Sequence, residues 1–367
     1  MKILVRADAS HQMGVGHVFR CLALAEALRE SGSAVTFVCR ELPGNLCGFL
    51  EARGTVRVWR LPRPNQELIS TTADLPHAAW LGVDQQTDAQ QVLDLLKAES
   101  AAPMADWLIV DHYALDRTWE RSLRPAVRHL MAIDDVADRF HEVELLLDQN
   151  IWANPAERYR QLVHDDCQLL LGTRFALLRP EFAAARATRA KRDGSVRRVL
   201  VCFGGTDATD ETAKALAALR RIGRPDLTIA VVVGAQNQQR QEIADQVAEL
   251  PGASLYVQAD QMAELMACAD LAIGAGGSTT WERCCMGLPA LIIAVARNQE
   301  GIVEACNSHG AGIYLGTASA VTVSGLQQAI EDLLGSPVKV QRLAERAAML
   351  VDGRGTDRVI AAMEGRS

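Results

Sequence analysis

The residues with the clearest chemical potential lie in a loop near the amino terminus, where a histidine follows two glycines. The loop spans residues 8–17, and apolar residues at helical spacing continue over residues 18–28. Gly14 and Gly16 permit a tight turn and a close approach of the backbone to a ligand. His17 falls where the helix should begin, and the positive end of a helix favours a neutral imidazole that can accept a proton. The sequence predicts His17 as a general base; a histidine that only caps the helix or hydrogen-bonds the loop is the structural alternative.

A second group of small and hydroxyl-bearing residues follows a strand in the other half of the chain, over residues 274–282. Exposed glycine N–H groups at the start of a helix bind phosphate groups well, so this segment predicts a diphosphate site. Ser278, Thr279 and Thr280 could add hydroxyl donors, and Glu282 could accept hydrogen bonds from two ribose hydroxyls. The structural alternative is a hydroxyl cap with a glutamate in the first helical turn, which stabilises any helix.

Polar residues stand at three further predicted strand ends. Asn298 and Gln299 follow a strand, and amide side chains suit sugar hydroxyls and N-acetyl groups. Residues 111–113 (Asp-His-Tyr) and 134–135 (Asp-Asp) end strands in the first half and could orient His17 or contact a sugar. Carboxylates that cap loops and helices are the simpler alternative. Residues 134–135 belong to no recognised metal-ligand motif, so we expect neither a metal nor another cofactor.

The first glycine-rich loop departs from the nucleotide-binding motifs that it superficially resembles. In a dinucleotide fingerprint, a third glycine would stand in place of Phe19, and an acidic residue would close the second strand, where Arg40 stands. The loop also lacks the Lys-Ser/Thr pair of a P-loop. NAD-dependent and P-loop chemistry are therefore disfavoured.

The chain alternates short β-rich apolar runs with longer helical patterns, which is typical of βαβ units and parallel sheets. Its 367 residues fit two domains. We expect two doubly wound, Rossmann-like α/β domains that face each other across a cleft: residues 1–183, with the catalytic loop, and residues 199–367, with the nucleotide site. A basic connector at 184–198 would join them. Ligands of such sheets bind beyond the carboxyl ends of the strands.

Individual elements can be placed from the same patterns. Residues 60–100 predict variable loops with one helix near 88–98, and residues 340–363 predict a helix. Strands are predicted at residues 3–5, 34–39, 107–110, 129–133, 199–203, 229–234, 254–257, 271–273 and 290–293.

The composition is that of an ordinary globular protein. Hydrophobic residues make up 49% and charged residues 23%, and the net charge of −7 gives the molecule no overall attraction to nucleic acid or anionic lipid. Nine cysteines, without Cys-x-x-Cys spacing, predict reduced thiols. No apolar run approaches the ~20 residues that span a bilayer, and charge enters too early for a signal peptide. We expect a cytoplasmic monomer with no nucleic-acid partner and no stable membrane association.

Taken in order, these motifs resemble those of the UDP-sugar hydrolases of pseudaminic acid biosynthesis. That family is similar in fold to GT-B glycosyltransferases, especially the transferase that adds N-acetylglucosamine during peptidoglycan synthesis. The resemblance implies a GT-B fold and hydrolysis of UDP-2,4-diacetamido-2,4,6-trideoxy-β-L-altropyranose to the free sugar and UDP. The segments that carry it are residues 6–10, 14–21, 111–113, 133–135, 172–182, 203–207, 276–282 and 298–300.

The resemblance also implies roles for individual residues. His17 would be the base, Tyr113 and Asn298 would lie near the sugar, and Ser278 and Glu282 would contact UDP. The remaining substrate-binding residues predicted within these motifs are Gly14, Gly16, Arg179, Gly205, Gly277, Thr279 and Gln299.

The predicted reaction inverts the anomeric carbon. His17 would take a proton from the attacking water as UDP leaves toward the second domain. The main alternative is a GT-B glycosyltransferase with the same UDP-sugar donor, in which His17 deprotonates a sugar or lipid acceptor. The first domain shows no large apolar, base-flanked stretch for membrane docking, which counts modestly against a lipid acceptor. A catalytically silent nucleotide-sugar binding protein is the third reading.

Overall fold

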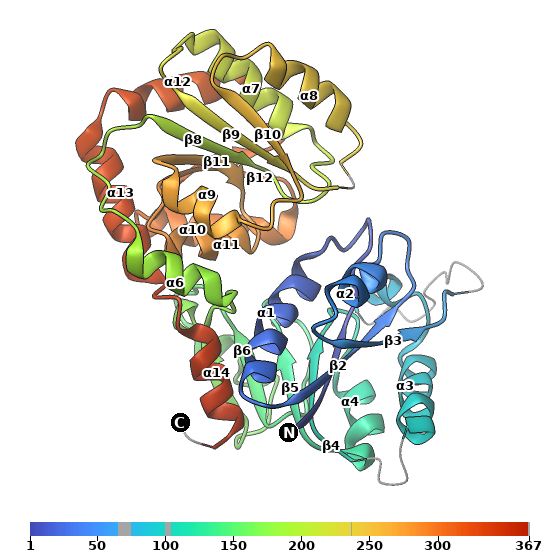
Figure 1. Ribbon diagram of the computed structural model, residues 1–367. Helices are drawn as coiled ribbons and strands as arrows, with labels where there is room; N and C mark the ends of the chain where they lie inside the picture. Colours follow the sequence, from blue (N-terminus) through green and yellow to red (C-terminus); the bar gives the residue numbers. More distant parts are fainter. Residues whose placement is uncertain (65–74, 100–103, 236, 366–367) are drawn as a thin grey trace. The chain divides into compact units, whose positions relative to one another are not determined.

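The computed structural model describes residues 1–64, 75–99, 104–235 and 237–365, which form two compact α/β units (Figure 1). The first unit comprises Met1–Arg179 and Gly355–Ser367, and the second comprises Pro180–Arg354. Each unit contains one parallel sheet with helices on its faces. The prediction of two doubly wound α/β domains is therefore confirmed.

The sheet of the first unit has seven parallel strands in the order β3-β2-β1-β4-β5-β6-β7. Strand order reverses between β1 and β4, and the carboxyl ends of such a pair flank the place where open α/β sheets bind ligands. The strands are β1 (Lys2–Ala7), β2 (Ala34–Arg40), β3 (Arg57–Leu61), β4 (Ala105–Asp111), β5 (Val127–Ile133), β6 (Leu145–Asp148) and β7 (Gln168–Leu171).

Helices cover this sheet on both faces. The predicted helix near residues 88–98 is confirmed as α3, whereas predicted loops at residues 65–74 and 100 lie outside the described residues. The helices and 3-10 turns of this unit are α1 (Gly16–Glu30), α2 (Cys47–Arg53), η1 (Ala78–Leu81), α3 (Gln85–Glu99), α4 (Arg117–Leu123), η2 (Arg124–Ala126), α5 (Pro155–Tyr159), η3 (Thr173–Phe175) and α14 (Gly355–Met363).

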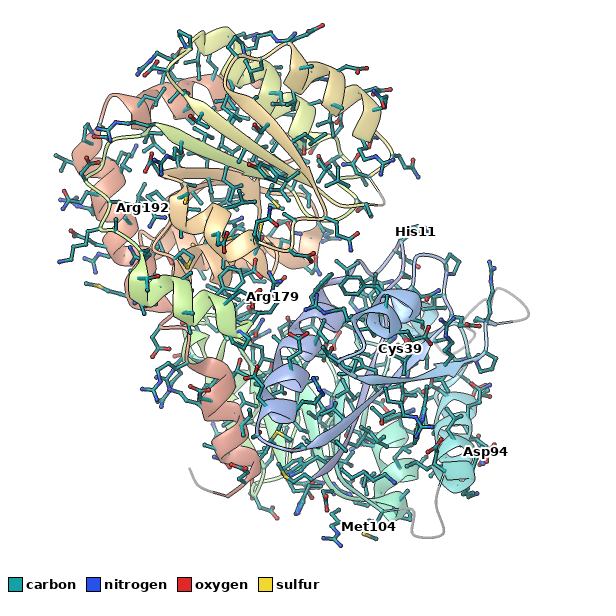
Figure 2. All side chains as sticks on the ribbon, viewed as in Figure 1. His11, Cys39, Asp94, Met104, Arg179 and Arg192 are labelled. Atoms are coloured by element: carbon teal, nitrogen blue, oxygen red, sulfur yellow. The ribbon has the colours of Figure 1, made fainter. Side chains whose placement is uncertain are left out.

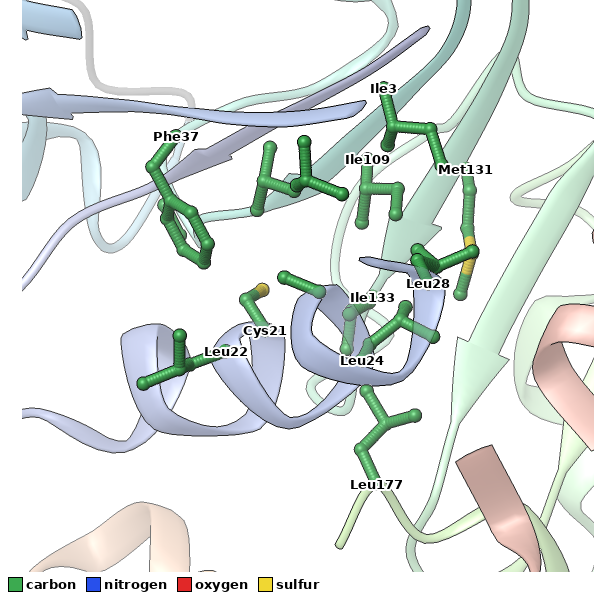
Figure 3. Close-up of a cluster of buried hydrophobic side chains, with 14 of the residues drawn as sticks. Ile3, Cys21, Leu22, Leu24, Leu28, Phe37, Ile109, Met131, Ile133 and Leu177 are labelled. Atoms are coloured by element: carbon green, nitrogen blue, oxygen red, sulfur yellow. The ribbon is translucent and has the colours of Figure 1, made fainter. Parts of the chain in front are cut away.

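Strand β1 shows how the sheet acquires two cores. Ile3 belongs to a buried cluster with Leu24 and Leu28 of α1 (Figure 3). Leu4 points to the opposite face and belongs to the cluster that includes Trp119 of α4. Because both faces are buried, the strands are almost continuously apolar, and this made them recognisable in the sequence.

Helix α14 completes the first core from the far end of the chain. Val359 and Ile360 lie in the apolar cluster of α1, and Thr356 Oγ1 donates to the carbonyl of Leu178 at 3.1 Å. The sequence pattern predicts one helix over residues 340–363. The structure instead ends α13 (Pro337–Leu350), turns, and begins α14 in the other unit.

The sheet of the second unit has six parallel strands in the order β10-β9-β8-β11-β12-β13 and reverses between β8 and β11. The strands are β8 (Arg198–Cys202), β9 (Thr228–Val233), β10 (Ala253–Val257), β11 (Leu271–Ala275), β12 (Ala290–Ala294) and β13 (Ile313–Thr317). The helices are α6 (Pro180–Thr188), α7 (Glu211–Ile222), α8 (Arg240–Ala248), α9 (Met262–Cys268), α10 (Thr279–Cys285), α11 (Arg297–Ser308), α12 (Val323–Leu334) and α13.

The basic segment expected to be a connector is part of the second unit. Arg186 on α6 donates to the carbonyls of Cys285 (2.5 Å) and Ala348 (2.9 Å). Arg192, labelled in Figure 2, donates to main-chain carbonyls within or just after α9 and α10, those of Met266, Ala269 and Met286. Cations at helix carboxyl ends satisfy carbonyls that have no partner inside the helix. The units therefore differ from the predicted ranges 1–183, 184–198 and 199–367 at this segment and at α14.

A buried cluster of charges fixes one face of the first sheet. The Asp88 carboxylate of α3 accepts from Arg6 Nη2 at 2.8 Å, Arg40 Nη2 at 2.6 Å and Trp119 Nε1 at 2.9 Å. Asp8 accepts from Arg6 Nη1 at 2.6 Å and from the Arg40 N–H at 2.7 Å. All four charged side chains are fully buried. Arg40, where a dinucleotide-binding strand would carry an acid, is thus a structural residue.

We expect Asp88→Asn to destabilise the protein by about 3–5 kcal/mol, because it leaves two buried guanidinium groups short of negative charge. Urea unfolding measures this difference. Glu51→Gln is the control, because Glu51 pairs with Arg60 in solvent and its loss should have no measurable effect. Equal unfolding free energies for Asp88→Asn and the wild type would contradict the expectation.

Candidate functional site

His17 and Asp111 meet at the place where strand order reverses in the first sheet. Asp111 is the last residue of β4 and lies beside Ala7, the last residue of β1. The loop after β1 leads into α1, which carries His17 in its first turn. His17 Nδ1 lies 2.5 Å from Asp111 Oδ1. The predicted base therefore has a carboxylate partner, one of the two candidates that the sequence left open.

The loop geometry explains the two glycines before His17. Gly14 has φ +79°, a conformation that side chains rarely adopt, and its N–H donates to the Ser10 carbonyl at 2.8 Å. Ser10 Oγ accepts from the Met13 N–H at 3.0 Å. Gly16 is the first residue of α1. The turn delivers His17 to the edge of the sheet.

Asp111 is held as an anion by several donors. Arg20, one turn further along α1, donates Nε to Oδ2 at 2.6 Å and Nη2 to Oδ1 at 2.7 Å. The Cys21 thiol also donates to Oδ2, at 3.4 Å. Burial alone would raise the pKa of Asp111, but the Arg20 charge and the His17 contact hold that pKa below its ordinary range. A buried carboxylate therefore faces the imidazole.

This contact determines where His17 carries its proton. An ionised carboxylate can only accept, so the neutral ring places its hydrogen on Nδ1 and leaves Nε2 as the acceptor. Among the described residues, Nε2 has no hydrogen-bond partner, yet it is not one of the fully buried polar atoms. His17 is 6% exposed. The ring is thus mostly covered, with its basic nitrogen unoccupied.

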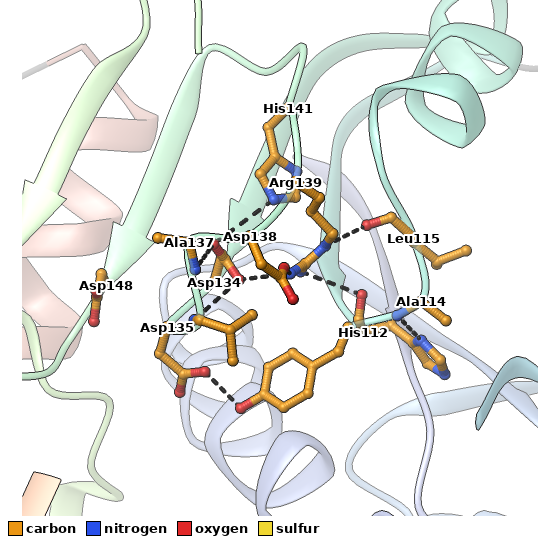
Figure 4. A network of polar contacts seen from close by, with 12 residues as sticks. His112, Ala114, Leu115, Asp134, Asp135, Ala137, Asp138, Arg139, His141 and Asp148 are labelled. Atoms are coloured by element: carbon orange, nitrogen blue, oxygen red, sulfur yellow. Dashed lines mark hydrogen bonds and ion pairs between the residues drawn. The ribbon is translucent and has the colours of Figure 1, made fainter. Parts of the chain in front are cut away.

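Tyr113 packs against His17, and Asp135 binds both Tyr113 and Arg20. The Tyr113 ring packs edge-on against the imidazole, with centroids 4.6 Å apart. Its hydroxyl donates to Asp135 Oδ1 at 2.5 Å (Figure 4), and Arg20 Nη1 donates to Asp135 Oδ2 at 2.8 Å. Burial and the Asp135 carboxylate raise the pKa of Tyr113 well above its ordinary value. The Tyr113 phenol therefore stays protonated. Its ring covers one side of the His17 imidazole.

Neighbouring residues of the same motifs serve the scaffold instead. Asp134 accepts from Arg139 Nη1 at 2.9 Å and caps the turn that follows β5 (Figure 4). His112 Nδ1 accepts from the Ala114 N–H at 3.1 Å, and its Nε2 lies 3.4 Å from Asp8. The pairs Asp134-Asp135 and His112-Tyr113 each divide into one structural residue and one residue of the His17 site.

Two aromatic side chains near Tyr113 were not anticipated. Trp80 lies in η1, and His77 directly precedes this turn. The ring centroids of Trp80 and His77 lie 5.8 Å and 5.2 Å, respectively, from that of Tyr113. His77 Nδ1 is buried without a partner among the described residues, and burial lowers the pKa of His77. Both residues come from the irregular region 60–100, where no periodicity or motif could have indicated them.

A fourth carboxylate lies at the same edge of the sheet. Asp148 ends β6 and accepts from Trp152 Nε1 at 2.7 Å, Arg158 Nη1 at 2.7 Å and the Tyr159 hydroxyl at 2.9 Å. Burial and the Asp135 carboxylate raise the pKa of Asp148 to about 7, against the opposing effect of the Asn150 N–H, the Tyr159 hydroxyl and Arg158. Four acids, Asp111, Asp134, Asp135 and Asp148, thus line the carboxyl ends of β4, β5 and β6.

The second unit gathers the other predicted residues at its own switch point. Gly205 follows β8, and Gly277 and Ser278 follow β11, the strand beside it. The backbones approach closely here: a Cβ on Gly234 would come within 2.1 Å of the Gly205 carbonyl. Ser278 is exposed and Thr279, the first residue of α10, is half-buried. Gly234 therefore has a steric reason, whereas a Cβ on Gly277 would meet only Gln299 Nε2, at 3.7 Å. The hydroxyls of Ser278 and Thr279 follow the end of β11.

The remaining predicted residues fall into different positions. Gln299 Oε1 accepts from the N–H groups of Gly276 (3.2 Å) and Val295 (3.1 Å), so its amide ties together the turns after β11 and β12. Asn298, beside it, is exposed. Glu282 lies partly buried on α10, and Arg179 ends the main segment of the first unit. Asn298 and Gln299 thus follow the end of β12, Glu282 and Arg179 do not stand directly after a strand, and Gln299 has a bracing role that its amide pattern did not indicate.

Comparison with known proteins places the fold. Residues 199–353 match the Glycosyltransferase family 28 C-terminal domain. The MurG structure of Acinetobacter baumannii covers 99% of both chains with a TM-score of 0.65 at 14% identity. Arabidopsis thaliana UGT89C1 complexed with UDP gives a TM-score of 0.65 at 15% identity, again over 99% of both chains. The chain has a GT-B fold.

Two curated relatives match at higher identity over shorter segments. The spore coat polysaccharide biosynthesis protein SpsG of Bacillus subtilis is 29% identical over 212 residues, which is 56% of this chain and 61% of the relative. The UDP-2,4-diacetamido-2,4,6-trideoxy-β-L-altropyranose hydrolase of Campylobacter jejuni is 30% identical over 210 residues, again 56% and 61%. The chain therefore spans about six tenths of the length of these relatives.

In the part of the chain that the structure describes, every helix is too short or too polar to traverse a bilayer.

The two histidines at the end of β4 and the start of α1 should show opposite tautomers. We expect neutral His17 to carry its hydrogen on Nδ1, because Asp111 accepts there. We expect neutral His112 to carry its hydrogen on Nε2, because its Nδ1 accepts from a backbone N–H. Long-range ¹H–¹⁵N spectra of labelled imidazoles report this directly, with His17→Asn and His112→Asn for assignment. A neutral His17 that carries its hydrogen on Nε2 would contradict this expectation.

Proposed function

We propose that this protein hydrolyses a UDP-sugar by inverting attack of water at the anomeric carbon, with His17 as the general base. The observation that carries the proposal is the buried Asp111–His17 pair, which leaves Nε2 as an acceptor without a partner among the described residues. The pair stands where the strand order reverses, the position at which open α/β sheets generally bind ligands. The similarity to the Campylobacter jejuni hydrolase supports UDP-2,4-diacetamido-2,4,6-trideoxy-β-L-altropyranose as the substrate.

In the proposed reaction, Nε2 takes a proton from water while the water oxygen bonds to the anomeric carbon. The bond between that carbon and the diphosphate oxygen breaks, and its electron pair leaves with UDP. The Asp111 carboxylate stabilises the imidazolium that forms, and Arg20 keeps Asp111 ionised and in position. The proton on His17 then returns to solvent. UDP needs no separate acid if its charge is stabilised where it is bound.

Further residues are assigned by the same proposal. Tyr113, whose ring lies against His17, and Asn298 would contact the sugar. The turn after β11, with Gly277, Ser278 and Thr279, would hold the diphosphate. Glu282 would accept from the ribose hydroxyls, with Gly205, Gly14, Gly16 and Arg179 contributing to the substrate site. The proposal requires that the base of the first unit and the nucleotide site of the second unit serve the same substrate molecule.

We expect His17→Asn to lower kcat by a factor on the order of 10² to 10⁴ while UDP still binds, because only proton transfer is lost. Asp111→Asn should cause a loss on a similar scale, since it removes both the orienting acceptor and the stabilising charge. ¹H NMR of the reaction gives the rate and the anomeric configuration of the first-formed sugar. His164→Asn, an exposed histidine in the same unit, is the matched control. Undiminished hydrolysis by a clean His17→Asn preparation would refute the assignment.

A glycosyltransferase is the second candidate function, favoured by the family 28 match over residues 199–353. His17 would then deprotonate an acceptor hydroxyl instead of water. Release of UDP and free sugar in the absence of any acceptor separates the two. Hydrolysis at the full rate without acceptor supports the hydrolase, and UDP release that depends on an added sugar or lipid acceptor supports the transferase.

A further inference from the structure

Arg283 is a buried cation directly beneath the turn after β11. It lies on α10 and is 3% exposed. Its Nη2 donates to the Ala275 carbonyl at 2.7 Å and to Thr280 Oγ1 at 3.0 Å, and its Nη1 donates to Thr279 Oγ1 at 3.4 Å. A Cβ on Gly274 would lie 3.0 Å from Nη1, so the glycine leaves room for the guanidinium. No motif in the sequence singles out this residue.

Unlike the buried arginines of the first unit, Arg283 has no carboxylate partner. Arg6, Arg20 and Arg139 each form ion pairs with buried or nearly buried aspartates. No acid lies within ion-pair distance of Arg283 among the described residues, and its Nε is buried without an acceptor there. Burial lowers the pKa of Arg283, and this is opposed first by neighbouring thiols and least by Glu282. A buried charge without a counter-charge is strongly unfavourable.

Thiols form the rest of its charged or ionisable surroundings. The neighbours are Cys202, Cys284 and Cys306. Burial raises the pKa of Cys202, and a hydrogen bond from the Cys284 thiol lowers the pKa of Cys306. The protein itself therefore offers Arg283 a thiol at best, where the other buried arginines have aspartates.

The hydrogen bond from Arg283 to Thr279 connects the buried charge to the surface of the turn. A hydroxyl oxygen that accepts from a guanidinium turns its own hydrogen away from that donor. Thr280, the other hydroxyl acceptor, is 1% exposed, whereas Thr279 is half-buried beside the exposed Ser278. Thr279 is therefore the hydroxyl that can pass the polarisation of Arg283 to a group outside the turn.

We propose that Arg283 is a positioning residue that supplies the buried counter-charge for an anionic group, the diphosphate of a nucleotide, held at residues 276–279 and contacted through the Thr279 hydroxyl. The inference rests on the proposed function for the identity of the anion. Ligand binding would then relieve a charge that the ligand-free protein leaves uncompensated.

The test compares UDP with uridine, which lacks the diphosphate, by isothermal titration calorimetry on the full chain. Arg283→Met should weaken UDP about tenfold or more and leave uridine unchanged, because the diphosphate loses the counter-charge that acts on it through Thr279. Thr279→Val should show the same selective loss and Thr279→Ser should restore it. Ligand-free Arg283→Met should melt no lower than the wild type, since an apolar side chain of similar length replaces an unpaired charge.

Controls separate this role from general effects. Arg346→Met makes the same change in net charge at an exposed site of the unit, and Cys306→Ala tests the thiol as the counter-charge; neither should alter UDP binding. UDP affinity that survives both Arg283→Met and Thr279→Val, equal losses for UDP and uridine, or a loss in Cys306→Ala as large as in Arg283→Met would each overturn the inference.

The outcomes also distinguish this inference from the proposed reaction. If UDP binding depends on Arg283 but the UDP-sugar is not hydrolysed, the proposed reaction is refuted and the inference about Arg283 stands. If the UDP-sugar is hydrolysed but UDP affinity does not depend on Arg283, the inference is refuted and the proposed reaction stands. A wild-type chain that binds no UDP would overturn both.

Discussion

The ionised, fully buried Asp111 is the constraint on which the site of the first unit depends. A carboxylate in that position must be surrounded by donors, and the chain supplies them from one face of α1: His17 at the start of the helix and Arg20 one turn later. Arg20 in turn binds Asp135, and Asp135 fixes Tyr113 against the imidazole. Each side chain is oriented by the next, so the His17 imidazole is held in one orientation without a ligand.

The sheet topology places this network at a useful point. In both units the strand order reverses once, and the sequence-predicted glycines follow central strands: Gly14 and Gly16 follow β1, Gly205 follows β8 and Gly277 follows β11. Parallel strands bring those loops to one edge, where a backbone without side chains can approach a ligand closely. The two edges differ in chemistry. One is rich in carboxylates around an imidazole, and the other carries hydroxyls over a buried guanidinium.

Local patterns were enough to predict much of this. Continuous apolar strands alternating with helices indicated two parallel sheets, and glycine spacing singled out Gly14, Gly16 and the turn at 276–279. The sequence also offered Asp111 and Asp135, but it could not separate them from their neighbours His112 and Asp134, because the division depends on which way each side chain faces. Arg20, His77 and Arg283 could not be identified, since their surroundings come from residues distant in the chain. The bracing role of Gln299 and the cap formed by Arg192 were hidden for the same reason.

The return of α14 means that the backbone passes between the two units twice, once near Arg179 and again near Arg354. A single cut can therefore never release either half intact. Removing everything after residue 180 would strip Val359 and Ile360 from the first core, while a fragment that begins at residue 180 would carry α14 with its apolar face uncovered. Chimeras between relatives face the same restriction: exchanging the second half requires two junctions, or the terminal helix of one parent must fit the core of the other.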